Sequence, residues 1–185
     1  KYGLGKHWNL SVNFSDIRDI DFKREFYKEI NAEVVYKKEE TYQIILGVQH
    51  QMIDIELYFG KGGEEDVKTI TPYFEFLYYV NDKTSLRIES QYMYNKHDIG
   101  SWVYGLVELG ISPHCIFGLS NMYNTFSPKG TKALHYPTAG LVYNYGNNRF
   151  GLRYVKQIQG IVCSGGICRL EPAFSGFRAS ITSTF

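Results

Sequence analysis

The feature that most constrains the fold of this chain is the strict alternation of its last thirteen residues, 173–185. One set of positions carries Phe177, Ile181 and Phe185 among small residues, and the positions between them carry Arg178 and several hydroxyl side chains. A period of two belongs to a β-strand, because a strand presents successive side chains on opposite faces. The strand pattern continues to the final aromatic residue, whereas soluble domains usually end in a loose tail.

The same period recurs along the whole chain, and no convincing stripe with the helical period of 3.6 residues interrupts it. We therefore predict an all-β fold with about ten strands. The predicted strands are 4–14, 27–36, 42–51, 70–80, 86–95, 103–111, 117–123, 139–145, 150–154 and 173–185.

Near Met52 the alternation slips, so that Ile53, Ile55, Leu57 and Phe59 become the apolar set. A slip of one residue exchanges the two faces, which predicts a β-bulge. We interpret this segment as a strand that leaves the membrane and continues as an external hairpin. The return strand contains a proline, Pro72, which cannot donate to a strand ladder. We therefore expect that stretch above the bilayer.

Composition and connection lengths favour a transmembrane up-and-down β-barrel. Aromatic residues make up 16% of the 185 residues, yet no apolar run approaches the roughly 18 residues of a membrane helix. Connections after even-numbered strands are short and most others are long, as in a barrel whose tight turns face the periplasm. Aromatic residues near the short turns and near the long loops predict two interfacial girdles. The alternative is a soluble or periplasmic β-barrel whose aromatics line a cavity for an apolar ligand.

The chain resembles bacterial outer-membrane β-barrels in its alternation, its aromatic bands and its terminal strand. The segments 163–169 and 172–174, followed by that strand, look like the end of a family of envelope barrels with no settled activity. The resemblance implies an outer-membrane location and contact with lipid. It also implies that the assembly machinery reads the terminal strand, through Phe177, Ile181 and Phe185. We expect one domain over 1–185, either a complete barrel or the C-terminal portion of a larger one.

The positions that face away from lipid carry charges with a directional bias. Acidic residues fall on the second to sixth predicted strands and arginines on the last two, although Arg87 breaks the pattern. In a wide lumen such charges set up a transverse field that orients polar solutes. In a narrow barrel the same charges pair and plug the interior. The predicted lumen residues are Glu29, Glu33, Glu75, Glu89, Glu108, Arg149, Arg153 and Arg178.

Cys163 and Cys168 enclose a Ser-Gly-Gly-Ile loop that permits a tight reversal of the backbone. In an oxidising envelope this predicts a local disulfide, and the alternative is a pair of free thiols. A metal site is not favoured, because no further Cys or His lies nearby in sequence. Cys115 is interpreted as an apolar strand residue.

Other candidate sites carry little weight. His97-Asp98 suggests the acid and histidine pair of a surface hydrolase, and Asn121 is a lone polar residue on an outward face. One such pair is weak evidence for catalysis. The acidic segment 62–66 matches no calcium loop. A net charge of +1 without a basic block excludes nucleic acid as a favoured partner.

The sequence therefore predicts a non-enzymatic outer-membrane barrel without cofactor or metal. Its role would be passage of small solutes, or support of an envelope complex through the external loops. A surface hydrolase built on the same barrel is the third possibility, after the soluble ligand-binding barrel.

Overall fold

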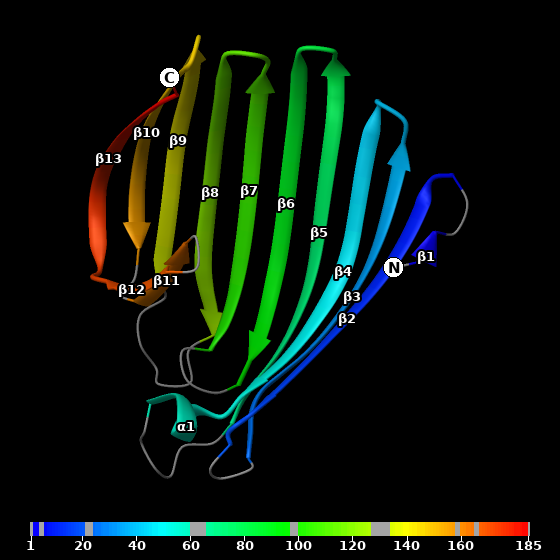
Figure 1. Ribbon diagram of the computed structural model, residues 1–185, viewed down its shortest axis with the longest axis vertical. Helices are drawn as coiled ribbons and strands as arrows, with labels where there is room; N and C mark the ends of the chain where they lie inside the picture. The colour runs from blue at the N-terminus through cyan, green and yellow to red at the C-terminus, as the bar shows by residue number, and fades with distance from the viewer. Residues whose placement is uncertain are drawn as a thin grey trace.

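The computed structural model of the chain describes residues 2–3, 6–20, 24–59, 66–96, 100–126, 134–157, 160–164 and 167–184. Its main element is one sheet in which strands adjacent in sequence are also adjacent in space (Figure 1). The strands of this sheet are β1 (Tyr2–Gly3), β2 (Trp8–Arg18), β3 (Glu25–Lys38), β4 (Tyr42–Ile53), β5 (Val67–Asn81), β6 (Thr84–Asn95), β7 (Ser101–Ile111), β8 (Cys115–Phe126), β9 (His135–Tyr145), β10 (Asn148–Gln157) and β13 (Phe174–Ser183). A separate hairpin pairs β11 (Gly160–Ser164) with β12 (Ile167–Glu171).

Strands β2 to β10 and β13 confirm the predicted all-β, antiparallel, up-and-down order of ten strands. The predicted difference between the two ends of the sheet is also present. Figure 1 shows the short turns 39–41, 82–83, 112–114 and 146–147 at one end, and the connections that follow β2, β4, β6, β8 and β10 at the opposite end. In the last short turn Gly146 has a φ of 54°, the left-handed conformation that two-residue hairpin turns require.

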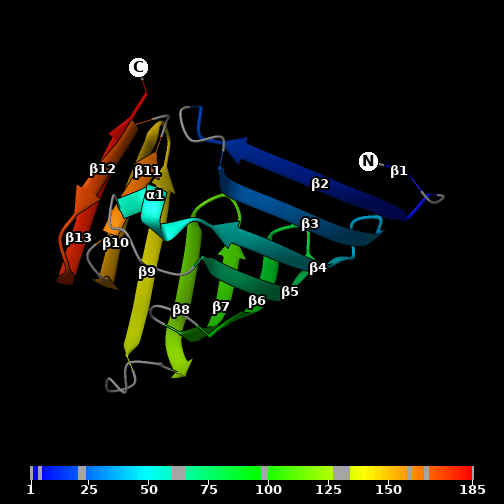
Figure 2. The same ribbon diagram turned by 90° about the horizontal axis from the view of Figure 1, so that it is seen from below.

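In the described residues the sheet is open and does not form the predicted closed cylinder. β13 pairs only with β10, while β2 pairs with β3 and, through two residues, with β1. Figure 2 shows the sheet bent into a trough with β2 and β13 at its two rims. A cylinder requires its first and last strands to pair. Each rim instead offers a strand edge.

The predicted bulge near Met52 and the external hairpin are wrong. β4 keeps its register with both neighbours to its end at Ile53, and the short helix α1 (Ile55–Phe59) follows. The backbone N–H of Leu57 donates a hydrogen bond to Oδ1 of Asp54 at 3.0 Å. Asp54 therefore acts as the N-cap that starts a helical turn in place of a strand.

Pro72 lies inside β5, and its segment is part of the main sheet. It pairs with Val48 of β4, whereas the pairing of β5 with β6 is interrupted at Thr71 and Pro72. The interruption is expected, because proline has no N–H to donate to a neighbouring strand.

The two faces of the sheet differ in chemistry, and we name them the apolar face and the polar face. The apolar face carries the exposed side chains of Val12, Phe14, Ile30, Leu46, Val48, Ile70, Phe74, Tyr78, Tyr92, Val103, Val107, Leu109, Phe117, Leu119, Leu141, Tyr143, Phe150, Leu152, Phe177 and Ile181. The polar face carries Glu29, Asn31, Glu33, Gln49, Gln51, Tyr73, Glu75, Arg87, Glu89, Gln91, Tyr104, Glu108, Ser120, Thr138, Arg149, Arg153, Arg178 and Ser180.

The fold has almost no conventional core. Among the described residues, Val67 and Trp102 are the only buried hydrophobic side chains. Within the same part of the chain, no helix has the length and apolar character needed to cross a membrane.

The polar face is on the concave side of the trough. One cavity of about 240 Å³ is lined by polar-face residues from five consecutive strands, from Gln49 on β4 to Met122 on β8. Strands lie about 4.8 Å apart, so a single small cavity can touch five of them only where the sheet curves around it. The charged side chains of this face therefore converge.

Candidate functional site on the polar face

The structure places all eight predicted lumen residues on the polar face. The acids lie on β3 (Glu29, Glu33), β5 (Glu75), β6 (Glu89) and β7 (Glu108), and the arginines lie on β10 (Arg149, Arg153) and β13 (Arg178). Acidic and basic groups therefore occupy opposite walls of the trough, with β8 and β9 between them (Figure 2).

Arg87 breaks the pattern in sequence, and in space it belongs to the acidic wall. Its Nη2 atom lies 2.8 Å from Oε2 of Glu75 and 2.8 Å from Oε2 of Glu89. Glu108 is directly opposite Arg87 on β7. Two carboxylates share one guanidinium and a third carboxylate, that of Glu108, lies on the next strand, so this part of the wall keeps a net negative charge.

Tyr73 ties the acidic wall together. Its ring lies over Gly47 on β4, and its hydroxyl is 3.1 Å from Oδ1 of Asn31 and 3.1 Å from Oε2 of Glu33 on β3. Glu29 accepts hydrogen bonds from the hydroxyl of Tyr27 and from Nε2 of Gln51. Glu29 and Glu33 are therefore held by neutral donors.

The basic wall consists of arginines on β10 and β13. Arg178 donates from Nη2 to Oε1 of Gln157 at 3.0 Å, and its guanidinium lies 5.3 Å from the centre of the Phe174 ring. Arg149 and Arg153 join Arg178 around a cavity of about 440 Å³ that includes Gly151. Three arginines at one cavity make this wall attractive to anions.

Between the two walls, one row of the sheet has no side chain at its two middle positions, and we name this row the glycine floor. Glu108, Gly118, Gly140 and Arg153 stand directly opposite one another on β7, β8, β9 and β10. These four residues line one cavity of about 200 Å³. Glu108 and Arg153 were predicted from the sequence as lumen residues, whereas Gly118 and Gly140 were not singled out. Only the strand register shows that the two glycines share a row with these charges.

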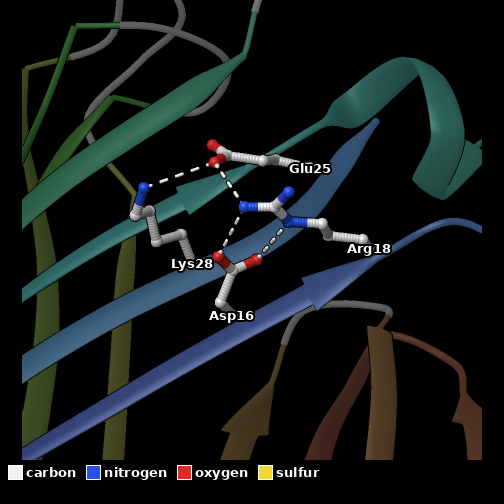
Figure 3. A network of polar contacts seen from close by, with 4 residues as sticks. All are labelled: Asp16, Arg18, Glu25 and Lys28. Atoms are coloured by element: carbon white, nitrogen blue, oxygen red, sulfur yellow. Dashed lines mark hydrogen bonds and ion pairs between the residues drawn. The ribbon is translucent and has the colours of Figure 1, made fainter. Parts of the chain in front are cut away.

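A charged cluster lies on the apolar face at the loop end of β2 and β3 (Figure 3). Arg18 lies 3.1 Å from Asp16 and 3.7 Å from Glu25, and Lys28 lies 3.3 Å from Glu25. The hydrogen bonds from Arg18 lower the pKa of the Asp16 carboxyl. The cluster therefore marks the limit of the apolar surface towards the long connections.

The predicted terminal strand is β13, and it lies at one rim of the open sheet with its apolar side chains exposed. Phe177 and Ile181 are each 73% exposed on the apolar face of β13. Phe185, the third predicted residue of this set, lies outside the described residues.

Cys163 and Cys168 are directly opposite each other in the β11–β12 hairpin. Their side chains lie outside the described part of the structure, so the disulfide stays a prediction. Cys115 is a free, half-buried thiol at the start of β8. Its row includes Ile111 and Tyr143, which confirms its place on the apolar face.

The predicted hydrolase groups do not form a catalytic set in the described residues. His97 and Asp98 lie outside them, as do residues 62–65 of the acidic segment. Asn121 is on the apolar face, and Nδ1 of His135 lies 3.5 Å from its Oδ1. The residues directly opposite Asn121 are Gly105 and Pro137, and the residue directly opposite His135 is Tyr123. No group of metal ligands occurs in the part of the chain described.

The family model that matches this chain covers residues 2–185 and is described as a family of unknown function, DUF6029. The chain belongs to DUF6029. No curated protein and no solved structure matches it. The matched range contains both walls of the trough and the glycine floor, so these features lie within the DUF6029 region. The family supplies no activity, and function has to be argued from the two faces of the sheet.

Proposed function

We propose that this chain forms the wall of a transmembrane β-barrel in a bacterial outer membrane, with its polar face lining a path for small polar solutes. In this proposal lipid covers the apolar face. The β2 and β13 rims pair to close the barrel, either with each other or through additional strands. The proposed role is passive and non-enzymatic.

The exposed apolar face is the observation that supports this proposal. It extends from Val12 on β2 to Ile181 on β13 and contains most of the large hydrophobic side chains of the sheet. Each such side chain left in water forgoes about 1.5–3 kcal/mol of burial free energy. Contiguous apolar surface beyond a few hundred Å² is rare on soluble monomers. A soluble ligand-binding barrel would place these side chains inside, whereas here the concave face is charged.

The height of the apolar face fits a bilayer. On β3 the outward residues between Lys28 and Lys38 are Ile30, Ala32, Val34 and Tyr36. At about 3.4 Å per residue the distance from Lys28 to Lys38 is about 34 Å along the strand. A strand tilt of about 40° reduces it to about 26 Å, close to the apolar band of membrane barrels.

Both limits of this band carry the expected side chains. At the loop end stands the charged cluster of Figure 3. Towards the short turns the rings of Trp8, Tyr36, Tyr42, Phe76 and Tyr78 form a chain of contacts with centre-to-centre distances of 4.6–6.2 Å. Aromatic rings with a polar edge favour the membrane interface.

Site-directed spin labelling along β7 tests the membrane assignment. In a background without the native cysteines, single cysteines replace Leu106, Val107, Glu108 and Leu109 in protein refolded into lipid bilayers. We expect labels at 107 and 109 to be accessible to oxygen, and labels at 106 and 108 to be accessible to a water-soluble nickel complex. Equal accessibility to the nickel complex at all four positions, with solubility in the absence of detergent, would contradict the proposal.

Planar bilayer recordings test the solute path separately. We expect purified protein to give stepwise conductance that decreases when bulky side chains are introduced at Gly118 and Gly140. Protein that inserts and migrates differently before and after boiling, yet never conducts, would leave the membrane assignment standing and remove the solute path.

A further inference from the structure

We infer that the glycine floor between Glu108 and Arg153 is a binding site for a small zwitterion of the α-amino acid type. This inference rests on the proposed solute path and names the class of solute that the path would select. Its basis is a pair of opposite charges that lean towards each other across two glycines without meeting.

The geometry of the row supplies the first step. The four residues Glu108, Gly118, Gly140 and Arg153 lie on neighbouring strands, so the outer two backbones are about 14 Å apart. A Cβ atom added to Gly118 would lie 3.9 Å from Oε2 of Glu108. A Cβ atom added to Gly140 would lie 3.5 Å from Nε of Arg153. Each charged side chain therefore extends over the glycine next to it.

The second step is that both charges are available. Within the described part of the chain, neither Glu108 nor Arg153 forms a hydrogen bond or ion pair. Arg87, the cation opposite Glu108, is held by Glu75 and Glu89. The gap between carboxylate and guanidinium is a cavity of about 200 Å³. A ligand can enter where a direct salt bridge would otherwise form.

The surrounding field sets the orientation of a ligand. The side of Glu108 keeps a net negative charge, because three carboxylates (Glu75, Glu89 and Glu108) lie near one guanidinium, which pairs with Glu75 and Glu89. The side of Arg153 is positive, since Arg178 is directly opposite it and Arg149 lines the adjoining cavity. An ammonium group is attracted to Glu108 and a carboxylate to Arg153, whose planar guanidinium can bind a carboxylate with two hydrogen bonds.

A molecule with only one charge can pair with only one of the two walls. A free α-amino acid carries both groups a few bonds apart and has a side chain that can point along the trough. The other side chains that line the cavity are apolar (Leu106, Ile116, Val142) or polar and uncharged (Tyr104, Ser120, Thr138), so its charges are those of Glu108 and Arg153. The floor therefore favours zwitterions over simple cations, simple anions and neutral solutes.

Equilibrium binding of three probes tests the inference on the unmodified protein in detergent. The probes are L-alanine, N-acetyl-L-alanine, which lacks the ammonium group, and L-alaninamide, which lacks the carboxylate. We expect L-alanine to bind at least about tenfold more tightly than either analogue, because each loses one charge-assisted contact. Equal affinity for all three probes would overturn the inference.

Variants then assign the preference to the row. E108Q should remove the advantage of L-alanine over N-acetyl-L-alanine, and R153Q should remove its advantage over L-alaninamide. R18Q, in the exposed charged cluster on the apolar face, is the matched control and should keep the preference for L-alanine over both analogues.

The outcomes separate the inference from the proposed function. Protein that conducts in bilayers but shows no preference for L-alanine contradicts the zwitterion site and leaves the solute path intact. An unchanged preference for L-alanine over both analogues in E108Q and in R153Q would also contradict the site, provided that each variant still shows the heat-dependent gel migration of the folded protein.

Discussion

At the scale of single residues, the contact of Tyr73 with Gly47 shows how the trough keeps its shape without a core. The Tyr73 ring crosses β4 at the one position that has no side chain and reaches Asn31 and Glu33 on β3. Three strands are thereby joined on the polar face by one side chain. Glycine is needed because a Cβ atom there would overlap the ring.

Gly47→Ala should therefore destabilise the folded protein by about 1–3 kcal/mol, the usual effect of overpacking, because the Tyr73 ring has to move away from its partners. The free energy of unfolding is measured by urea titration of protein refolded into bilayers. Gly105→Ala is the matched control, since an added Cβ at Gly105 would meet no atom within 4 Å. Equal stability of the two variants would show that Tyr73 does not brace the strands.

At the scale of elements, α1 depends on a buried carboxylate. The Asp54 side chain is only 4% exposed, and Nη2 of Arg24, from the neighbouring connection between β2 and β3, lies 2.7 Å from its Oδ2. Nη1 of Arg24 donates to Glu56 at 3.0 Å. Arg24 thus links two connections at the loop end of the sheet.

Arg24→Ala should open this end, because it leaves the Asp54 charge buried without its partner. We expect cleavage by chymotrypsin within α1 to become several-fold faster, as measured by mass spectrometry of timed digests. Arg18→Ala removes an arginine from the exposed cluster of Figure 3 and should leave cleavage within α1 unchanged, because exposed ion pairs contribute little. Unchanged cleavage in Arg24→Ala would mean that α1 is held by other contacts.

The β11–β12 hairpin carries the second prediction at this scale. Directly opposite positions of an antiparallel pair bring two Cβ atoms to about 4.5–5.5 Å, close enough for a disulfide after a small adjustment. We expect a maleimide reagent to label Cys115 alone in unfolded, unreduced protein, and all three cysteines after reduction. Labelling of Cys163 and Cys168 before reduction would show that they are free thiols.

The sequence was sufficient for the elements that follow from local periodicity. A period of two predicts the ten strands, the four short turns between them and the face on which each residue lies. None of these features depends on which residues of neighbouring strands are paired. The helix α1 was missed because Ile55 to Phe59 is a short apolar run, and periodicity alone cannot separate a strand from a helical turn at that length. The N-cap role of Asp54 was the available signal.

Features that depend on register or closure could not be predicted. The sharing of Arg87 between Glu75 and Glu89, and the alignment of Gly118 with Gly140, each require the exact register of two neighbouring strands. The open edge between β2 and β13 is a property of the whole sheet, because strand number and stagger together decide whether it closes. The charge pattern itself was visible because it needs only the face and the strand order.

At the scale of the whole molecule, the membrane assignment makes a prediction about depth that no water-exposed sheet shares. Leu119 lies midway along β8 on the apolar face and is exposed, and Tyr145 lies at the short-turn end of β9 and is also exposed. In a bilayer, Leu119→Arg should cost about 2–4 kcal/mol of folding free energy, and Tyr145→Arg about 0–1 kcal/mol. In water both positions would tolerate arginine to within about 0.5 kcal/mol, since neither side chain is part of a core.

Ser120→Arg provides the internal control for this comparison. Ser120 follows Leu119 on the same strand but lies on the polar face, so arginine there meets water and the acidic wall. Urea titrations of the three variants in lipid vesicles should therefore rank Leu119→Arg as clearly the least stable. Equal stabilities for Leu119→Arg and Tyr145→Arg would mean that the folding free energy cost of arginine does not depend on its position along the apolar face. The apolar face would then have to be covered by protein and not by lipid, and the polar face would not line a path across a membrane.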